Sequence, residues 1–267
     1  MTPAAGDALP ISCVVITRNA AGHLGATLDS AACCAERLVL DCGSTDGTVG
    51  LATARGARVE HQPFLGFGPQ KRRACELAAH DWILSLDADE ALDEEAVAGL
   101  RALDLGDTTA SWEWRRRTFI GRRELRHGPW GNERVLRLFN RRHAGFSDHA
   151  VHERVVAAAP PRLAPGTILH RSFTGCDDVL VRSARYATPK AAILRAKREH
   201  TPAWLLPARG AAAFFKSWVV QGGWRDGAAG FVVALSRVVD STLCRAIVLC
   251  DDPPAPPSDP APPPPPA

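Results

Sequence analysis

The stretch DWILSLDADEAL, residues 81–92, places carboxylates directly after an apolar run. Asp87 and Asp89 are separated by one residue, and Glu90 follows them. The run WILSL is short and uninterrupted, as expected for a strand buried on both faces. Crowded carboxylates repel each other unless a cation lies between them, and hard divalent cations prefer oxygen ligands. The pattern predicts a Mg²⁺ or Mn²⁺ site; the alternative is that these acids only cap a following helix.

The first hundred residues predict the framework that holds this pair. Strand-like segments alternate with helical ones. The strands are at 11–17, 37–41, 57–61 and 82–86. The helices are at 22–34, after the cap-type residues 43–48 to about residue 55, at 69–80 and at 92–103. Such alternation predicts an α/β fold with a Rossmann-like, mainly parallel sheet flanked by helices. Ligands of open α/β sheets bind beyond the carboxyl ends of the strands. Thr17, Asp41 and the Asp87/Asp89 pair all fall there, so we expect one shared crevice.

From residue 111 onward the pattern is less regular. Strand-like stretches at 135–140 and 166–173 are expected to extend the sheet. Helices are expected at 178–199 and 227–248, and between them lies an apolar stripe formed by Ala211, Phe214, Phe215, Trp218 and Val219. Neither C-terminal helix has the ~18 uninterrupted apolar residues of a membrane span, which leaves peripheral contact open. The proline-rich residues 251–267 predict a disordered tail.

Composition argues against several classes of protein. The 267 residues carry a net charge of +3, and the basic residues cluster at 115–123 and 141–143, which favours a local acidic partner over nucleic acid. The eight cysteines form no C-x-x-C pair, so neither a zinc site nor a disulfide framework is indicated. Residues 1–10 lack the basic region of a signal peptide, and Arg18 ends the first apolar run. These features predict a cytoplasmic protein.

Four motifs carry a family resemblance: VVITRNA, VLDCGSTDGT, PQKRRACELAAHDWILSLDADE and VHERV. Their order and spacing resemble those of family-2 inverting glycosyltransferases, over about residues 11–245. The chain is most similar to the subgroup that adds a sugar to the inner core of bacterial lipopolysaccharide, of the β-1,4-glucosyltransferase type. The resemblance implies a type A glycosyltransferase fold, a UDP-hexose donor, expected to be UDP-glucose, and Mg²⁺ or Mn²⁺. It also implies a place in the cytoplasm or at the cytoplasmic face of the inner membrane.

The resemblance divides the chain into four parts. It implies a flexible N-terminus at 1–10, a catalytic domain at 11–176, a helical extension at 177–250 and the tail at 251–267. Within the catalytic domain, 11–105 forms the nucleotide-binding half and 106–176 the acceptor half. The donor sugar, the acceptor, the preferred metal and the oligomeric state, a homo-oligomer included, stay open.

On the donor side, the resemblance assigns residues to the nucleotide sugar. Thr17 and Asn19 lie at the nucleotide pocket, and Asp41 accepts a hydrogen bond from the base. Gln70 and Lys71 approach the donor. Two family positions differ, because Ala20 stands where an acidic residue is usual and Arg72 where Asn is frequent.

Asp87 and Asp89 resemble the motif that places the metal on the diphosphate. His170 in ILHRSF completes the metal shell or contacts the diphosphate, or is an ordinary hydrogen-bonded structural histidine. Inverting transfer needs a base that takes the proton of the attacking hydroxyl. Glu153 in VHERV matches the family's position for that base, with Asp148 as second choice and a surface ion pair as the structural alternative.

The acceptor side is expected to involve Arg122, Arg134, Trp130 and His152. Guanidinium groups bind phosphate or carboxylate bidentately, so the arginines between 115 and 137 would suit a charged glycan; a solvated face is the alternative. Trp130 could stack on a sugar ring or belong to the core.

Two other classes of protein share part of this pattern. A haloacid-dehalogenase-like phosphohydrolase also has D-x-D after apolar residues, but on the first strand, whereas here the motif follows the fourth and precedes Glu90. A catalytically silent glycosyltransferase-like binding protein is the other alternative, and the presence of Asp41, Asp87, Asp89 and Glu153 argues against it.

Overall fold

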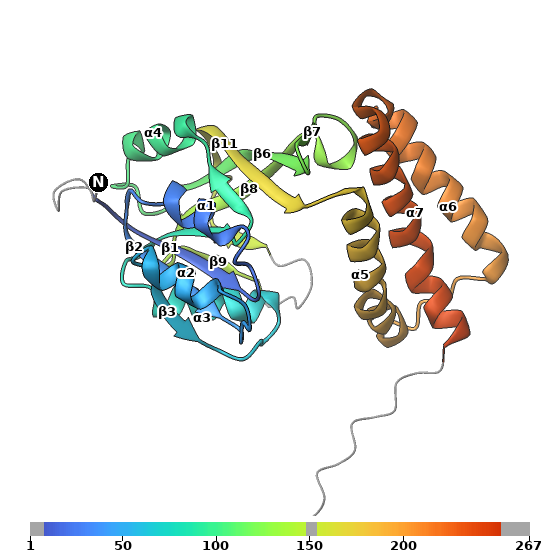
Figure 1. Ribbon diagram of the computed structural model, residues 1–267, viewed down its shortest axis with the longest axis horizontal. Coiled ribbons are helices and arrows are strands. Elements are labelled where there is room, and N and C mark those ends of the chain that lie inside the picture. Colours follow the sequence, from blue (N-terminus) through green and yellow to red (C-terminus); the bar gives the residue numbers. More distant parts are fainter. Residues whose placement is uncertain (1–7, 148–153, 252–267) are drawn as a thin grey trace, which may run out of the picture. The chain divides into compact units, whose positions relative to one another are not determined.

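The computed structural model describes residues 8–147 and 154–251 (Figure 1). The chain divides into two compact units, Met1–Gly175 and Cys176–Ala267. The first unit holds the β-sheets, and the second is built from helices.

The first half of unit 1 alternates strands and helices as the sequence predicts. The strands are β1 (Leu9–Thr17), β2 (Cys34–Asp41), β3 (Arg58–His61) and β4 (Trp82–Asp87). The helices are α1 (Leu24–Ser30), α2 (Thr48–Ala54), α3 (Phe67–Leu77) and α4 (Glu94–Ala102). β1 pairs in parallel with both β2 and β4, and β2 pairs in parallel with β3. The four strands therefore end at one edge of the sheet, as expected.

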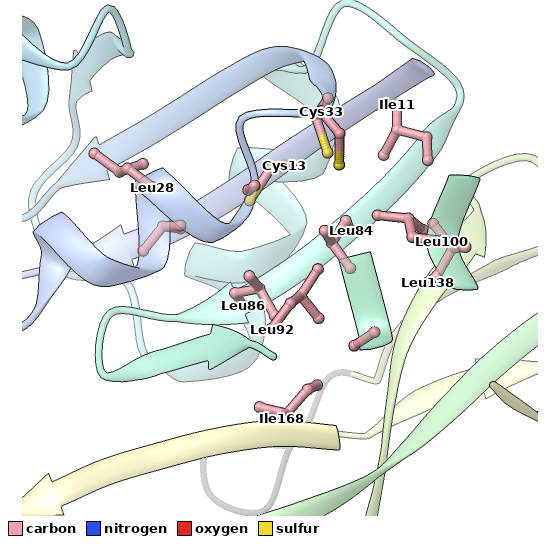
Figure 2. Close-up of a cluster of buried hydrophobic side chains, with 14 of the residues drawn as sticks. Ile11, Cys13, Leu28, Cys33, Leu84, Leu86, Leu92, Leu100, Leu138 and Ile168 are labelled. Atoms are coloured by element: carbon pink, nitrogen blue, oxygen red, sulfur yellow. The ribbon is translucent and has the colours of Figure 1, made fainter. Parts of the chain in front are cut away.

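Side chains of β1 alternate between two cores. Ile11, Cys13 and Val15 pack in one cluster with residues of α1, α2 and α4, whereas Val14 packs in a second cluster with residues of α3. Figure 2 shows the first cluster, in which Leu28 of α1 and Leu100 of α4 meet side chains of β1 and β4. Burying each large aliphatic side chain stabilises the fold by about 1.5–3 kcal/mol. Helices thus cover both faces of the sheet, which fixes the strand ends that carry polar residues.

The second half of unit 1 makes the sheet mixed. Its strands are β5 (Glu90–Leu92), β6 (Ser111–Ile120), β7 (Arg123–Leu125), β8 (Glu133–Asn140) and β11 (Arg162–Phe173). The order is β3-β2-β1-β4-β8-β6-β11-β5, with β7 on β6. β8 runs antiparallel to β4 and β6, β11 runs parallel to β6, and β5 runs antiparallel to β11. β9 (Ala144–Phe146) and β10 (Val155–Ala157) form a separate pair. This return of the chain places His170 opposite Glu90.

Five strands were not predicted. β5, β7, β9 and β10 have only three residues each, too few for a period to be visible. β6 carries Arg115, Arg116 and Arg117 in its middle, and the sequence reads there as a basic cluster. In β11, Gly166 has φ +77°, and a Cβ atom there would lie 2.1 Å from the Ala96 nitrogen. Glycine is therefore required where β11 meets the start of α4.

The described residues of unit 2, 176–251, form three α-helices: α5 (Cys176–Ala196), α6 (Leu206–Phe215) and α7 (Gly227–Cys250). α7 packs beside both α5 and α6 (Figure 1), and Ala187, Ala191 and Cys244 form its buried contact with α5. The predicted helices at 178–199 and 227–248 are confirmed within three residues. Short turns connect them: η2 (Ala203–Leu205), the π-helical η3 (Lys216–Val220) and η4 (Gly223–Asp226). Among the described residues, no helix has the length and apolar character needed to cross a membrane.

Candidate nucleotide and metal site

The loops after β1 and β2 are joined by hydrogen bonds. Asn19, with φ 54°, donates its backbone N–H to the Ser44 hydroxyl at 2.8 Å. Its side-chain oxygen accepts the Thr45 N–H at 2.8 Å. A non-glycine residue with positive φ is uncommon and is tolerated best by Asn, whose side chain here repays the strain locally. The two loops therefore form one preorganised wall at the carboxyl end of the sheet.

Asp41, at the end of β2, stabilises the loop that follows it. Its Oδ2 accepts the backbone N–H groups of Gly43 at 2.8 Å and Ser44 at 2.9 Å. Burial opposes ionisation, but the hydrogen bonds from the Ser44 hydroxyl and from these backbone groups hold the pKa of Asp41 below its usual value. Thr17 lies opposite Asp41 in the strand register, and its buried hydroxyl has no hydrogen-bond partner within the described residues. An unpaired buried hydroxyl costs roughly 1–3 kcal/mol, which a bound ligand could recover.

Gln70 and Lys71 are neighbours in the first half of α3 but have different surroundings. The Gln70 side chain is fully buried; its oxygen accepts the Leu65 N–H and its nitrogen donates to the Gln62 carbonyl, both at 3.2 Å. Gln70 thus fixes the loop before α3 and has no exposed surface for a donor. Lys71 places its Nζ 2.8 Å from Asp87 Oδ1 and 5.5 Å from the centre of the Phe146 ring.

Asp87 and Glu90 belong to a buried network of charges. Arg137 Nη2 lies 2.6 Å from both Asp87 Oδ2 and Glu90 Oε1, and Arg116 Nη1 lies 3.1 Å from Glu90 Oε1. Glu90 is fully buried and also accepts the Asp87 backbone N–H at 3.1 Å. Burial opposes ionisation of both acids, yet the charge of Arg137 holds the pKa of Asp87 and that of Glu90 below their usual values. The network therefore fixes the turn that carries the D-x-D pair.

Asp89 points away from this network, toward β11. His170 Nε2 lies 3.7 Å from Asp89 Oδ2, and the Ser172 hydroxyl donates to Asp89 and lies 2.6 Å from His170 Nε2. Burial and the charge of Arg116 lower the pKa of His170, which favours the neutral ring that binds metals. A carboxylate oxygen, an imidazole nitrogen and a hydroxyl thus converge at one point, a donor set that fits Mg²⁺ or Mn²⁺.

The predicted metal residues are therefore not all equivalent. Both carboxylate oxygens of Asp87 contact cationic side chains, those of Lys71 and Arg137. Asp89, in contrast, is adjacent to His170. Across residues 8–147 and 154–251, no group of three or more His, Cys, Asp or Glu side chains is arranged around one point. The protein itself thus offers Asp89 and His170, with Ser172, for an ion whose remaining ligands would come from water and substrate.

The predicted acceptor residues are dispersed. Arg122 lies exposed at the turn after β6, Arg134 of β8 pairs with Glu113 at 3.2 Å, and Trp130 stacks on Phe173 with ring centres 5.2 Å apart. This stacking brings Trp130 to the same strand end as His170. Predicted residues His152, Glu153 and Asp148 lie outside the residues that the structure describes.

Most of the arginines expected to bind a phosphorylated acceptor are already paired. Arg116 contacts Glu133 at 2.6 Å, and Arg117 contacts Glu124 at 2.8 Å. The sequence could not show this, because the acidic partners come from neighbouring strands. Only for Arg137 does the sequence indicate a buried ion pair, because this charged residue lies inside the apolar run VLRLFN. Ser172 had no such signal and was missed; Glu90 was noted only as a third carboxylate, and its buried pairing with Arg137 and Arg116 was missed.

Comparison with known proteins decides the family. Residues 12–159 match the family model described as glycosyl transferase family 2. The chain belongs to this family. The match and the sheet order confirm the predicted family and the predicted type A glycosyltransferase fold with its C-terminal helical region.

Individual relatives point in the same direction. The chain is 28% identical over 246 residues to "Lipopolysaccharide core biosynthesis glycosyltransferase LpsC" of Rhizobium meliloti. The aligned region covers 89% of this chain and 91% of that protein. It is 41% identical over 86 residues to an uncharacterized glycosyltransferase of Rickettsia felis, covering 32% of this chain and 30% of that protein. The predicted similarity to lipopolysaccharide core enzymes is thereby confirmed.

Two solved structures are also similar in part. Glucosyl-3-phosphoglycerate synthase from Mycobacterium tuberculosis, in complex with Mn²⁺, UDP and glucosyl-3-phosphoglycerate, is 26% identical over 43% of this chain and 45% of that chain, with a TM-score of 0.33. Mannosyl-3-phosphoglycerate synthase from Rubrobacter xylanophilus is 25% identical over 41% of this chain and 40% of that chain, with a TM-score of 0.34. The chain thus spans less than half the length of these structures.

Proposed function

We propose that this glycosyltransferase transfers a hexose, glucose, from a UDP-sugar to the inner core of lipopolysaccharide, with inversion at the sugar carbon and with Mg²⁺ or Mn²⁺. The observation that carries the proposal is the convergence of Asp89, His170 and Ser172 beside the preorganised loops of Asn19 and Asp41. The relative named as a lipopolysaccharide core enzyme supports the acceptor class.

Each donor-side group has a chemical task. Asp89 and His170 would hold the ion, which supplies positive charge to the leaving diphosphate when it is bound. Lys71 and Arg137 pair with both oxygens of Asp87, which holds the turn that carries Asp89 in position before the donor binds. The ionised Asp41 can accept the N–H of a uracil base, and the unpaired Thr17 hydroxyl can contact the nucleoside.

The acceptor step is proposed from the sequence motif. Glu153 takes the proton of the attacking hydroxyl as that oxygen bonds to the sugar carbon. The bond from the same carbon to the diphosphate oxygen breaks with its electron pair, so UDP leaves and an α-linked donor gives a β-linked product. Arg122, Arg134, Trp130 and His152 are proposed to contact the acceptor glycan. An acceptor of this kind places the protein at the cytoplasmic face of the inner membrane, which is part of the proposal.

A panel of donors tests this function. The full chain is incubated with UDP-glucose, UDP-galactose, UDP-N-acetylglucosamine and GDP-mannose, with deacylated lipopolysaccharide core as acceptor, with and without Mn²⁺. Mass spectrometry should detect one added hexose from a UDP-sugar only with metal, and NMR should show a β-linkage. UDP binding without transfer to any core acceptor would instead favour a catalytically silent protein or another acceptor. Family membership removes the phosphohydrolase alternative.

A further inference from the structure

Large apolar side chains of unit 2 are exposed along one continuous segment, residues 203–231, which we call the docking segment. Trp204 is 75% exposed and Val220 69% exposed, and Phe215, Trp224 and Phe231 are also exposed. Scattered exposed apolar residues are normal, but several bulky ones within one short segment indicate an interaction surface.

The local fold holds these side chains outward. Phe214, Trp218 and Phe231 form a packed aromatic cluster with ring centres 5.5–6.1 Å apart. The π-helical turn η3 follows Phe215 directly, and Phe215, Val219 and Val220 are exposed around it. The exposed side chains therefore project from a turn that is itself well packed.

The docking segment itself lines one wall of an open apolar groove between α6 and α7. The groove has a volume of about 700 Å³; Leu206, Phe214 and Phe215 line it from the docking segment and Val238 from α7. Phe215 belongs both to the groove and to the exposed set, so the two surfaces are continuous.

The charges of the docking segment have one predominant sign. It contains Arg209, Lys216 and Arg225 against the single acid Asp226. Arg209 and Lys216 are exposed and form no ion pair with any residue that the structure describes, and the Arg225 guanidinium lies 5.3 Å from the centre of the Trp224 ring. Exposed tryptophans interleaved with cations are typical of surfaces at the level of lipid headgroups, and cations near an anionic bilayer are attracted to it.

We propose that the docking segment binds the surface of an anionic bilayer. Trp204, Phe215, Val220 and Trp224 enter the headgroup region, and Arg209 and Lys216 contact lipid phosphates. The inference rests on unit 2 alone and goes beyond the proposed transferase activity, because it requires neither the donor nor the metal.

Binding of the full chain to phosphatidylcholine vesicles, with and without phosphatidylglycerol, tests the proposal. We expect cosedimentation with the anionic vesicles only, lost at high salt. Arg209→Glu and Lys216→Glu should each lower the partition coefficient at least about fivefold, the factor for one lost cation. The double variant Trp204→Ser/Trp224→Ser should bind weakly and lose most fluorescence quenching by brominated lipid.

Matched controls lie on α5 of the same unit. Arg185→Glu reverses an exposed cation, and Val181→Ser/Tyr186→Ser removes two exposed apolar side chains; both variants should bind as the wild type does. Equal losses in these controls, or equal binding to neutral and anionic vesicles, would overturn the proposal. The proposal would also be overturned if light scattering showed a dimer for the wild type and a monomer for the Trp204→Ser/Trp224→Ser variant, because the docking segment would then be a dimer interface. Binding of UDP to every variant is measured in parallel, so failure of the donor site is recognised separately.

Discussion

Glu90 is the residue whose replacement measures the buried charge network most directly. The change Glu90→Gln keeps the size of a side chain that is fully buried but removes its negative charge. Arg137 at 2.6 Å and Arg116 at 3.1 Å then lose an ionised partner. Breaking a buried ion pair costs about 3–5 kcal/mol, because the remaining charge is left uncompensated. Arg137 keeps Asp87 and Arg116 keeps Glu133, so we expect the lower end, about 3 kcal/mol.

Urea unfolding at neutral pH measures this cost. The fluorescence of the buried Trp82, Trp112 and Trp114 reports on unit 1, which holds the network. Glu76→Gln is the matched control, because its ion pair with Arg73 lies on the surface and should be worth about 0–1 kcal/mol. If Glu90→Gln lowers the free energy of unfolding no more than Glu76→Gln does, the network does not stabilise the D-x-D turn and the reasoning fails.

Three further predictions concern the cap of α4, the metal site and the base. Hydrogen bonds from Thr167 and Ala96 overcome the effect of burial and hold the pKa of Asp93 below its usual value. Asp93→Ala should therefore lower the free energy of unfolding by about 2 kcal/mol above about pH 5. In urea unfolding at several pH values, this difference from the wild type should shrink below about pH 4, because the wild-type carboxylate becomes protonated. A difference independent of pH would contradict the cap. Ser172→Cys should shift the preference of the site from Mg²⁺ toward Cd²⁺ or Zn²⁺ in metal titrations without donor, because thiolates prefer softer ions; an unchanged preference would mean that Ser172 contacts no ion. Glu153→Gln should keep UDP affinity and lower transfer at least about a hundredfold, and near-normal transfer would exclude it as the base.

The sequence predicted the parallel half of the fold because its strands are short, uninterrupted apolar runs that alternate with helical segments. β1 is buried on both faces, and α4 begins with acids after Asp93, whose side chain accepts the Ala96 N–H at 2.8 Å. It also predicted that Asp41 and the D-x-D pair share an edge, since the carboxyl ends of parallel strands coincide.

The rest depended on pairings between strands that are distant in sequence. Asp89 lies beside His170 only because β11 returns next to β5, and no local pattern shows that register. The same pairing neutralises arginines that the sequence presents as free, as Arg116 illustrates. The role of Gln70 was hidden for a similar reason, because its partners Gln62 and Leu65 belong to an irregular loop.

The most direct test of the metal-dependent donor site is calorimetric titration of UDP into the full chain, with and without Mn²⁺ and with GDP as the control. We expect UDP to bind tightly only with Mn²⁺ and in preference to GDP. Asp89→Asn should abolish the effect of the metal. Asp81→Asn, which changes an acid outside the site, should not. Equal affinity of UDP with and without Mn²⁺, or an Asp89→Asn variant that still responds to the metal, would contradict a metal-dependent donor site.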